Sequence, residues 1–213
     1  MALALALVLG LTVAACGSDG TDSSATTVAG DDAALSGITR AEPLEVGDVT
    51  VPDVTVGGAG GDFTMKAAAP DELVIAYFGY TSCPDICPTT MADLRTAFEQ
   101  VGAPADRVTV AMTTVDPERD SGRKLSHYLS SFFTDYRALR EPDLDRLAEI
   151  EAPFGAESSV VHNDDGTVDV THTAITYAID DEGRVLVEWP FGTEPDAIAD
   201  DLTVLLDRVG GTT

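Results

Sequence analysis

Two cysteines separated by three residues carry the chemistry that this sequence makes available. Cys83 and Cys87 stand in the segment TSCPDICP, directly after an apolar run and at the expected start of a helix. Pro88 has no N–H group and suits the first helical position, which predicts Cys87 as the N-cap. Thiols near the positive end of a helix dipole ionise readily. Such thiolates attack disulfides or bind soft metals.

The spacing of the cysteines leaves three uses open. Thioredoxin-type redox sites have two residues between their cysteines, whereas this pair has three, which leaves room for a metal between the sulfurs. A disulfide remains compatible with this separation, so the pair could be redox-active. A purely structural disulfide is disfavoured, because closing so short a loop restricts the unfolded chain very little.

A metal would need a further ligand, and the sequence contains three histidines. His127 falls within a predicted helix and His162 flanks an acidic turn, so both are expected at or near the surface. His172 precedes a predicted strand, 174–179, which we expect beside the strand 73–80 that leads to the cysteines. Two thiolates and one imidazole suit Cu(I) and can hold Cu(II), although zinc would accept the same ligands.

The elements that must position these residues alternate between strands and helices. Nearly continuous apolar runs at 73–80 and 108–115 predict strands buried on both faces. The other predicted elements are an edge strand or two short pieces at 48–56, a short strand at 63–66, a helix whose buried stripe is Met91, Leu94, Phe98 and Val101, helices at 118–132, 144–150 and 195–209, and hairpins at 158–162/167–171 and 174–179/184–189. This order predicts an α/β protein with a thioredoxin-like fold, in which helices flank a mixed central sheet and one hairpin is inserted.

Composition excludes one class of partner. The 213 residues include 12 Lys and Arg against 37 Asp and Glu, a formal net charge of −25. Nucleic-acid binding through phosphate neutralisation requires a basic face, so no nucleic-acid partner is expected. The same balance argues against adhesion to anionic lipid through a polybasic patch.

The first segments predict a membrane-tethered protein. The uncharged run 2–15 is shorter than the roughly 20 apolar residues that span a bilayer, and it ends in VAAC, which resembles a bacterial lipobox. We therefore predict a lipoprotein signal peptide at 1–16 with Cys16 lipidated; a plain signal peptide with an incidental cysteine is the alternative. Residues 17–44 are predicted as a flexible acidic tether and 45–213 as the folded domain. This order predicts lipid anchoring on the outer face of the bacterial cytoplasmic membrane.

Two motifs and a histidine resemble a known family. Residues 77–88 (YFGYTSCPDICP) are similar to the signature of the Sco/SenC copper proteins, and residues 115–120 (VDPERD) resemble the second motif of that family. His172 falls where the family places its histidine ligand. The resemblance covers roughly residues 45–208.

The resemblance implies a site and a role. One copper ion, as Cu(I) or Cu(II), would bind Cys83, Cys87 and His172, with Tyr80 and Asp116 beside the ligands. Family members help to build the binuclear copper centre of cytochrome c oxidase, as copper donors, as reductants of that centre's cysteines, or both. The implied partners are the oxidase subunit that carries this centre and a thiol reductant or copper donor. No catalytic residue is assigned.

Two departures and one rival hypothesis accompany the resemblance. Thr171 stands where the family often has Asp before the histidine, and Ser82 stands where many relatives have His. Any hydrogen bond that supports the metal must therefore come from elsewhere. The rival is a general extracytoplasmic thiol–disulfide reductase without an obligatory metal. Thioredoxins hold a cis-proline opposite their cysteines, but residues 154–189 contain no proline, which favours metal binding.

Overall fold

A five-stranded mixed sheet forms the centre of the computed structural model, which describes residues 34–211. Its strand order is β5-β4-β3-β8-β9. β3 runs parallel to β4, and β4 runs parallel to β5, whereas β8 and β9 are antiparallel to their neighbours. The five strands are β3 (Leu73–Gly79), β4 (Val108–Thr114), β5 (Tyr136–Leu139), β8 (Ile175–Ile179) and β9 (Val185–Pro190).

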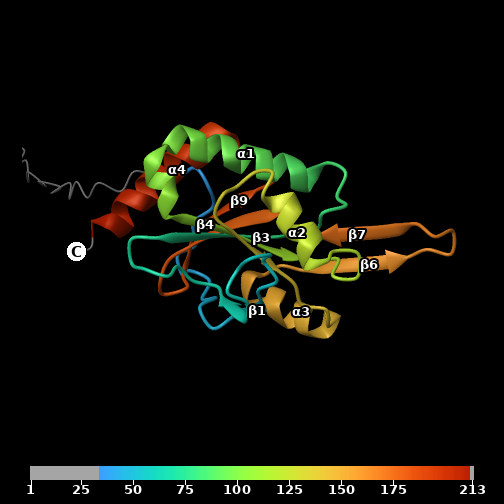
Figure 1. Ribbon diagram of the computed structural model, residues 1–213. Helices are drawn as coiled ribbons and strands as arrows, with labels where there is room; N and C mark the ends of the chain where they lie inside the picture. Colours follow the sequence, from blue (N-terminus) through green and yellow to red (C-terminus); the bar gives the residue numbers. More distant parts are fainter. Residues whose placement is uncertain (1–33, 212–213) are drawn as a thin grey trace, which may run out of the picture. The chain divides into compact units, whose positions relative to one another are not determined.

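Helices cover both faces of this sheet. α1 (Ile86–Val101) and α4 (Pro195–Gly210) pack together over one face, and α3 (Leu144–Glu151) lies on the other side (Figure 1). α2 (Gly122–Leu129) packs against β5. Short 3₁₀ helices follow α1 and α3 at Ala103–Arg107 and Ala152–Phe154. No helix within residues 34–211 has the length and apolar character that crossing a membrane requires.

The predicted apolar patterns correspond to the buried surfaces. Every residue of β3 is buried, as expected of a central strand with helices on both faces. On α1, the predicted stripe faces the core, with Met91 and Leu94 completely buried and Phe98 and Val101 partly buried. On the other face of the sheet, Phe78, Phe154 and Tyr177 form edge-to-face ring contacts. The core is therefore continuous through both layers.

Two small hairpins lie outside the central sheet. β1 (Thr50–Pro52) pairs with β2 (Asp62–Thr64), and β6 (Ser158–His162) pairs with β7 (Val168–His172). The β6–β7 hairpin is the predicted insertion and projects beyond the layers (Figure 1). Its last residue is His172, one of the candidate ligands.

The predicted order of elements is confirmed, with two differences. The sequence analysis missed β5, whose four residues, YRAL, are too few to show a clear alternation. The predicted helix 118–132 is too long, because α2 begins only at Gly122, where the hydroxyl of Ser121 caps the backbone N–H of Lys124. The preceding residues form a turn instead, and the buried Asp120 side chain is hydrogen-bonded outside the helix.

The predicted tether extends too far toward the domain. Ser36 and Gly37 donate their backbone N–H groups to the buried carboxylate of Asp201, at 2.6 and 2.9 Å. Ile38 then forms two backbone hydrogen bonds with Glu188 of β9. These contacts satisfy polar groups on an edge strand that would otherwise lack partners. Residues 36–44 therefore belong to the folded unit, whereas the signal peptide, Cys16 and the tether up to residue 33 lie outside the described residues.

Candidate metal centre

Three side chains of the predicted site come together at the end of β3. One ligand-type atom from each of Cys83, Cys87 and His172 lies within 4.8 Å of the others. Cys87 Sγ is 3.6 Å from His172 Nε2, and both cysteines are free thiols. Within residues 34–211, no other group of three Cys, His, Asp or Glu side chains converges in this way.

Strand pairing explains how residues so distant in sequence meet. β8 is antiparallel to β3, with Thr176 opposite Tyr77, so the start of β8 lies beside the end of β3. His172 precedes β8 by three residues, and the cysteines follow β3. The predicted neighbourhood of these two strands is thus confirmed.

The helix that carries the cysteines begins earlier than predicted. Its N-cap is Asp85 rather than Cys87, and Pro88 is its third residue. Proline causes no loss there, because the first four N–H groups of a helix have no partner within it. One of these groups, the N–H of Cys87, donates to Cys83 Sγ at 3.3 Å. The sulfur of Cys83 therefore acts as an acceptor at the helix N-terminus.

The two thiols are not equivalent. Burial raises the pKa of Cys83, but hydrogen bonds from the backbone of Cys87 and Asp85 outweigh it and bring the pKa below its ordinary value. Cys87 has no exposed surface, and burial raises its pKa to about 12. The expectation that the helix dipole favours both thiolates is therefore wrong for Cys87. In the metal-free protein Cys83 is the more acidic thiol.

The imidazole of His172 has its proton on the nitrogen remote from the cysteines. Nδ1 lies 3.1 Å from the carbonyl oxygen of Thr173, which can only accept, so Nδ1 carries the hydrogen. Nε2 then presents a lone pair toward Cys87. Burial lowers the pKa of His172, which favours the neutral ring that metals bind. This carbonyl supplies the support that an Asp at position 171 would otherwise give.

Of the two residues expected beside the ligands, Tyr80 contacts them directly and Asp116 does not. The ring of Tyr80 is edge-on to His172, with centroids 6.0 Å apart, and the Tyr80 hydroxyl contributes to the lowered pKa of Cys83. Asp116 is wholly buried and pairs with Arg119, whose guanidinium lies over the Tyr80 ring at 6.0 Å. Asp116 is thus connected to the ligands through Arg119 and Tyr80.

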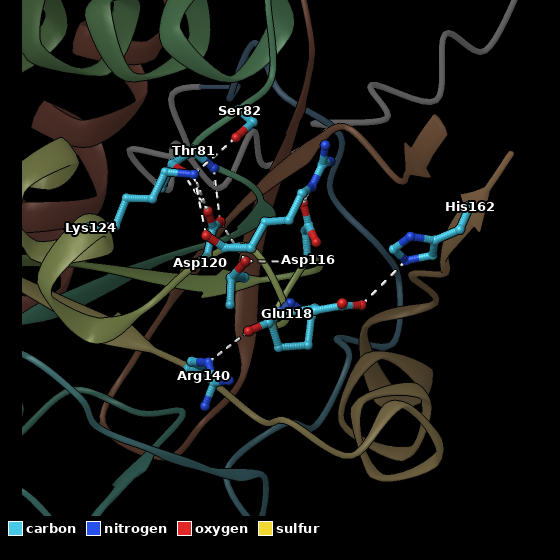
Figure 2. Close-up of polar contacts among 11 residues, drawn as sticks. Thr81, Ser82, Asp116, Glu118, Asp120, Lys124, Arg140 and His162 are labelled. Atoms are coloured by element: carbon cyan, nitrogen blue, oxygen red, sulfur yellow. Dashed lines mark hydrogen bonds and ion pairs between the residues drawn. The ribbon is translucent and has the colours of Figure 1, made fainter. Parts of the chain in front are cut away.

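The cysteine loop is the segment 80–85 between β3 and α1, which carries Cys83 and leads to Cys87. A buried carboxylate that the sequence analysis did not single out fixes the start of this loop. Asp120 accepts hydrogen bonds from the N–H and the hydroxyl of Thr81 and from the hydroxyl of Thr114 (Figure 2). Lys124 lies 3.3 Å from Asp120 and donates to Ser82 Oγ at 3.0 Å. Only the family motif at 115–120 pointed to this residue, because nothing in its local pattern predicts burial.

The other histidines do not join the site. His127 is exposed on α2. His162, at the end of β6, lies 3.3 Å from the carboxylate of Glu118 (Figure 2). Both positions agree with the surface locations predicted from the sequence.

Two of the donor atoms, Cys87 Sγ and His172 Nε2, have the separation that a small soft metal ion requires, and all three lie within 4.8 Å of one another. Bonds of about 2.0–2.3 Å to nitrogen and sulfur place neighbouring ligand atoms about 3.5–3.9 Å apart around a three- or four-coordinate ion. The distance of 3.6 Å between Cys87 Sγ and His172 Nε2 falls in that range. Two sulfurs and one imidazole nitrogen suit copper or zinc. The arrangement can therefore receive such an ion without a change of fold.

A family model and a similar protein both point to the same family. The model of the SCO1/SenC family matches residues 58–207. An SCO2-like protein of Rickettsia conorii is 30% identical over 125 residues, which are 58% of this chain and 60% of that protein, so the chain spans less than two thirds of this relative.

Two solved structures extend the likeness to the fold. The copper-bound ScoI of Bradyrhizobium japonicum is 27% identical, with a TM-score of 0.61 over 80% of this chain and 99% of that one. BsSco, described as having a disulfide switch and as a member of the Sco family of cytochrome c oxidase assembly proteins, is 21% identical, with a TM-score of 0.60 over 83% of this chain and 99% of that one. Because the family model spans nearly the whole described domain, this chain belongs to the SCO1/SenC family.

Proposed function

We propose that this protein binds one copper ion through Cys83 Sγ, Cys87 Sγ and His172 Nε2 and serves in the assembly of the binuclear copper centre of cytochrome c oxidase. The observation that carries the proposal is the convergence of these three atoms within 4.8 Å. The copper-bound structure of ScoI, a similar protein, supports the choice of copper over zinc. The donor set is compatible with this choice, since thiolates bind Cu(I).

The three ligands have different roles when an ion binds. Cys83 is partly exposed and has the lower pKa, so its sulfur meets an incoming ion first. His172 already presents the lone pair of Nε2 and needs no deprotonation. Cys87 loses its proton only when the ion arrives, because burial otherwise keeps it protonated. A partner's cysteines can then replace the ligands one at a time, beginning at the exposed sulfur.

The same inequality of the thiols supports a second activity. An exposed, acidic thiol next to a buried one is the arrangement of a dithiol reductant. The thiolate of Cys83 attacks a partner disulfide and forms a mixed disulfide, and Cys87 then displaces the partner's thiol. This chemistry would reduce the cysteines of the oxidase copper centre, or serve a general extracytoplasmic thiol–disulfide reductase that needs no metal. Oxidation to a disulfide would remove both sulfur ligands for copper.

The proposed location follows from the first residues of the chain. Lipidation of Cys16 would hold the domain on the outer face of the bacterial cytoplasmic membrane, where it can meet the oxidase subunit that carries the copper centre. A copper donor or a thiol reductant would act as the second partner. This part of the proposal rests on the lipobox-like sequence VAAC.

The test compares two histidine substitutions within one hairpin. His172→Ala removes the proposed ligand, and His162→Ala, ten residues earlier, removes an exposed imidazole that pairs with Glu118. In competition with a Cu(I) chelator under reducing conditions, we expect His172→Ala to lose at least about tenfold in affinity and His162→Ala to match the parent protein. Equal affinities for all three proteins would refute the ligand assignment. If the parent protein bound no copper, and its thiol–disulfide exchange were unchanged in both histidine variants, the general reductase would be favoured.

A further inference from the structure

Two tyrosine rings flank His172, and they differ in how firmly the fold holds them. Tyr77 lies within β3, is wholly buried and meets the imidazole edge-on at 5.9 Å. Tyr80 follows the last residue of β3, so no strand pairing fixes it. Its ring nevertheless meets the imidazole at 6.0 Å with an interplanar angle of 86°. Contacts other than the sheet must therefore orient the Tyr80 ring.

Arg119 makes such a contact. Its guanidinium carbon lies 6.0 Å from the centroid of the Tyr80 ring, at the outer limit of a cation–π interaction. The side chain of Arg119 is about one-third exposed, whereas the Tyr80 residue is buried. A cation over the face of a ring restricts its tilt, because the attraction is strongest at the centre of the face.

Asp116 holds Arg119 in this position. Its side chain is 1% exposed, one carboxylate oxygen pairs with Arg119 Nε, and the other, Oδ1, has no hydrogen-bond partner. A buried carboxylate without a counter-charge is strongly destabilising. Asp116 therefore needs Arg119 beside it, and this need keeps the guanidinium over Tyr80.

The charge of a copper-loaded site gives Arg119 a second effect, which is the attraction of its positive charge to the negative ligands. Two thiolates, a neutral imidazole and Cu(I) would carry one net negative charge. Lys124, a second cation near the cysteine loop, is paired with Asp120 as Arg119 is with Asp116, but its ammonium donates to Ser82. Arg119 is thus a cation that the fold places one ring away from the ligands.

We propose that Arg119, held by Asp116, is a positioning residue that fixes the Tyr80 ring against His172 and thereby tightens copper binding. The copper part of this inference rests on the function proposed above. The orientation of the ring is a property of the metal-free protein and can be tested without copper.

The experiment compares two arginines that differ in contact with the ring. Arg119→Gln removes the charge over Tyr80, Arg119→Lys keeps a charge, and Arg123→Gln removes an exposed charge at the start of α2. In the metal-free protein we expect Arg119→Gln to shift the ring-proton NMR signals of His172, because the ring current of Tyr80 acts on them. In Arg119→Lys the His172 signals should lie close to their positions in the parent protein, and Arg123→Gln should leave them unshifted.

Copper affinity supplies a second measurement. With Cu(I) and a competing chelator, we expect Arg119→Gln to weaken binding about tenfold, Arg119→Lys to recover most of it and Arg123→Gln to change nothing. Unmoved His172 signals in Arg119→Gln, or equal losses of affinity in Arg119→Gln and Arg123→Gln, would overturn the inference. If Arg119→Gln does not fold, Asp116→Asn must move the same signals. Failure of the parent protein to bind copper would refute the proposed function while leaving the NMR result to decide the positioning role.

Discussion

The cysteine loop and the histidine hairpin supply ligands to one site but are held in different ways. The cysteine loop joins two buried elements, and the wholly buried Asp120 binds its first residue through backbone and side chain. His172 ends the β6–β7 hairpin, whose two strands contain only exposed and half-buried residues. Its own hydrogen bond to Thr173 is local. The cysteine loop is therefore anchored to buried groups of the domain, whereas the imidazole is carried on a hairpin with no fully buried residue.

This difference has a functional consequence. Regions with few buried contacts open at lower free energy than the core. A hairpin that opens can release its ligand while the two sulfurs keep their places. The proposed transfer of copper to a partner would then begin with either the exposed sulfur or the imidazole, and it would not require unfolding of the domain.

The largest expected contrast lies within the cysteine loop itself. Burial raises the pKa of Cys87 to about 12, so only a very small fraction of this thiol is ionised at pH 7. Cys83 has a lowered pKa and is partly exposed. We expect iodoacetamide at pH 7 to label Cys83 at least about a hundred times faster than Cys87, as measured by mass spectrometry of the reduced, metal-free protein. Comparable labelling of both thiols would show that the helix start does not distinguish them.

The next contrast concerns stability. Asp120→Ala removes the acceptor for Thr81 and Thr114 and leaves buried donors without partners, so we expect the free energy of unfolding to fall by about 3 kcal/mol. Asp169→Ala is the matched change in the hairpin, where the carboxylate is exposed and accepts from Asn163. It should cost less than about 0.5 kcal/mol. Urea denaturation measures both values, and similar losses would contradict the idea that the two regions are held differently.

The two regions also differ in how far the sequence predicts them. The apolar runs of β3 and β4 and the stripe on α1 come from core packing, which leaves a periodic pattern, so these elements were predicted nearly to the residue. The meeting of His172 with the cysteines followed from one correct strand pairing. This part of the site could be predicted because it depends on topology.

Other features depend on single hydrogen bonds that leave no pattern in the sequence. The buried Asp120 accepts from the hydroxyl of Thr81, which is 39 residues away in sequence, and from that of Thr114, which is six residues away. α1 begins at Ile86, and the N–H of Cys87 in its first turn donates to Cys83 Sγ, a contact that the rule for proline at the first helical position does not consider. The docking of residues 36–38 depends on a carboxylate of α4 that reads as an ordinary surface residue. Composition alone therefore described segment 17–44 incompletely.

The smallest expected effect is a weak acid sensitivity of the histidine hairpin. Burial lowers the pKa of His172 in the folded protein, so the unfolded chain binds a proton more readily below about pH 6.5, the ordinary value for histidine. The stabilising contribution of the neutral ring is therefore complete above that pH and declines as the pH falls through it. Urea denaturation of the metal-free protein between pH 7.5 and pH 5.5 (about one unit either side of that value) should show a decline that is smaller in His172→Ala, whereas His162→Ala retains it. An identical decline in all three proteins would assign the acid sensitivity to other groups of the domain and show that the fold does not keep the ring of His172 buried.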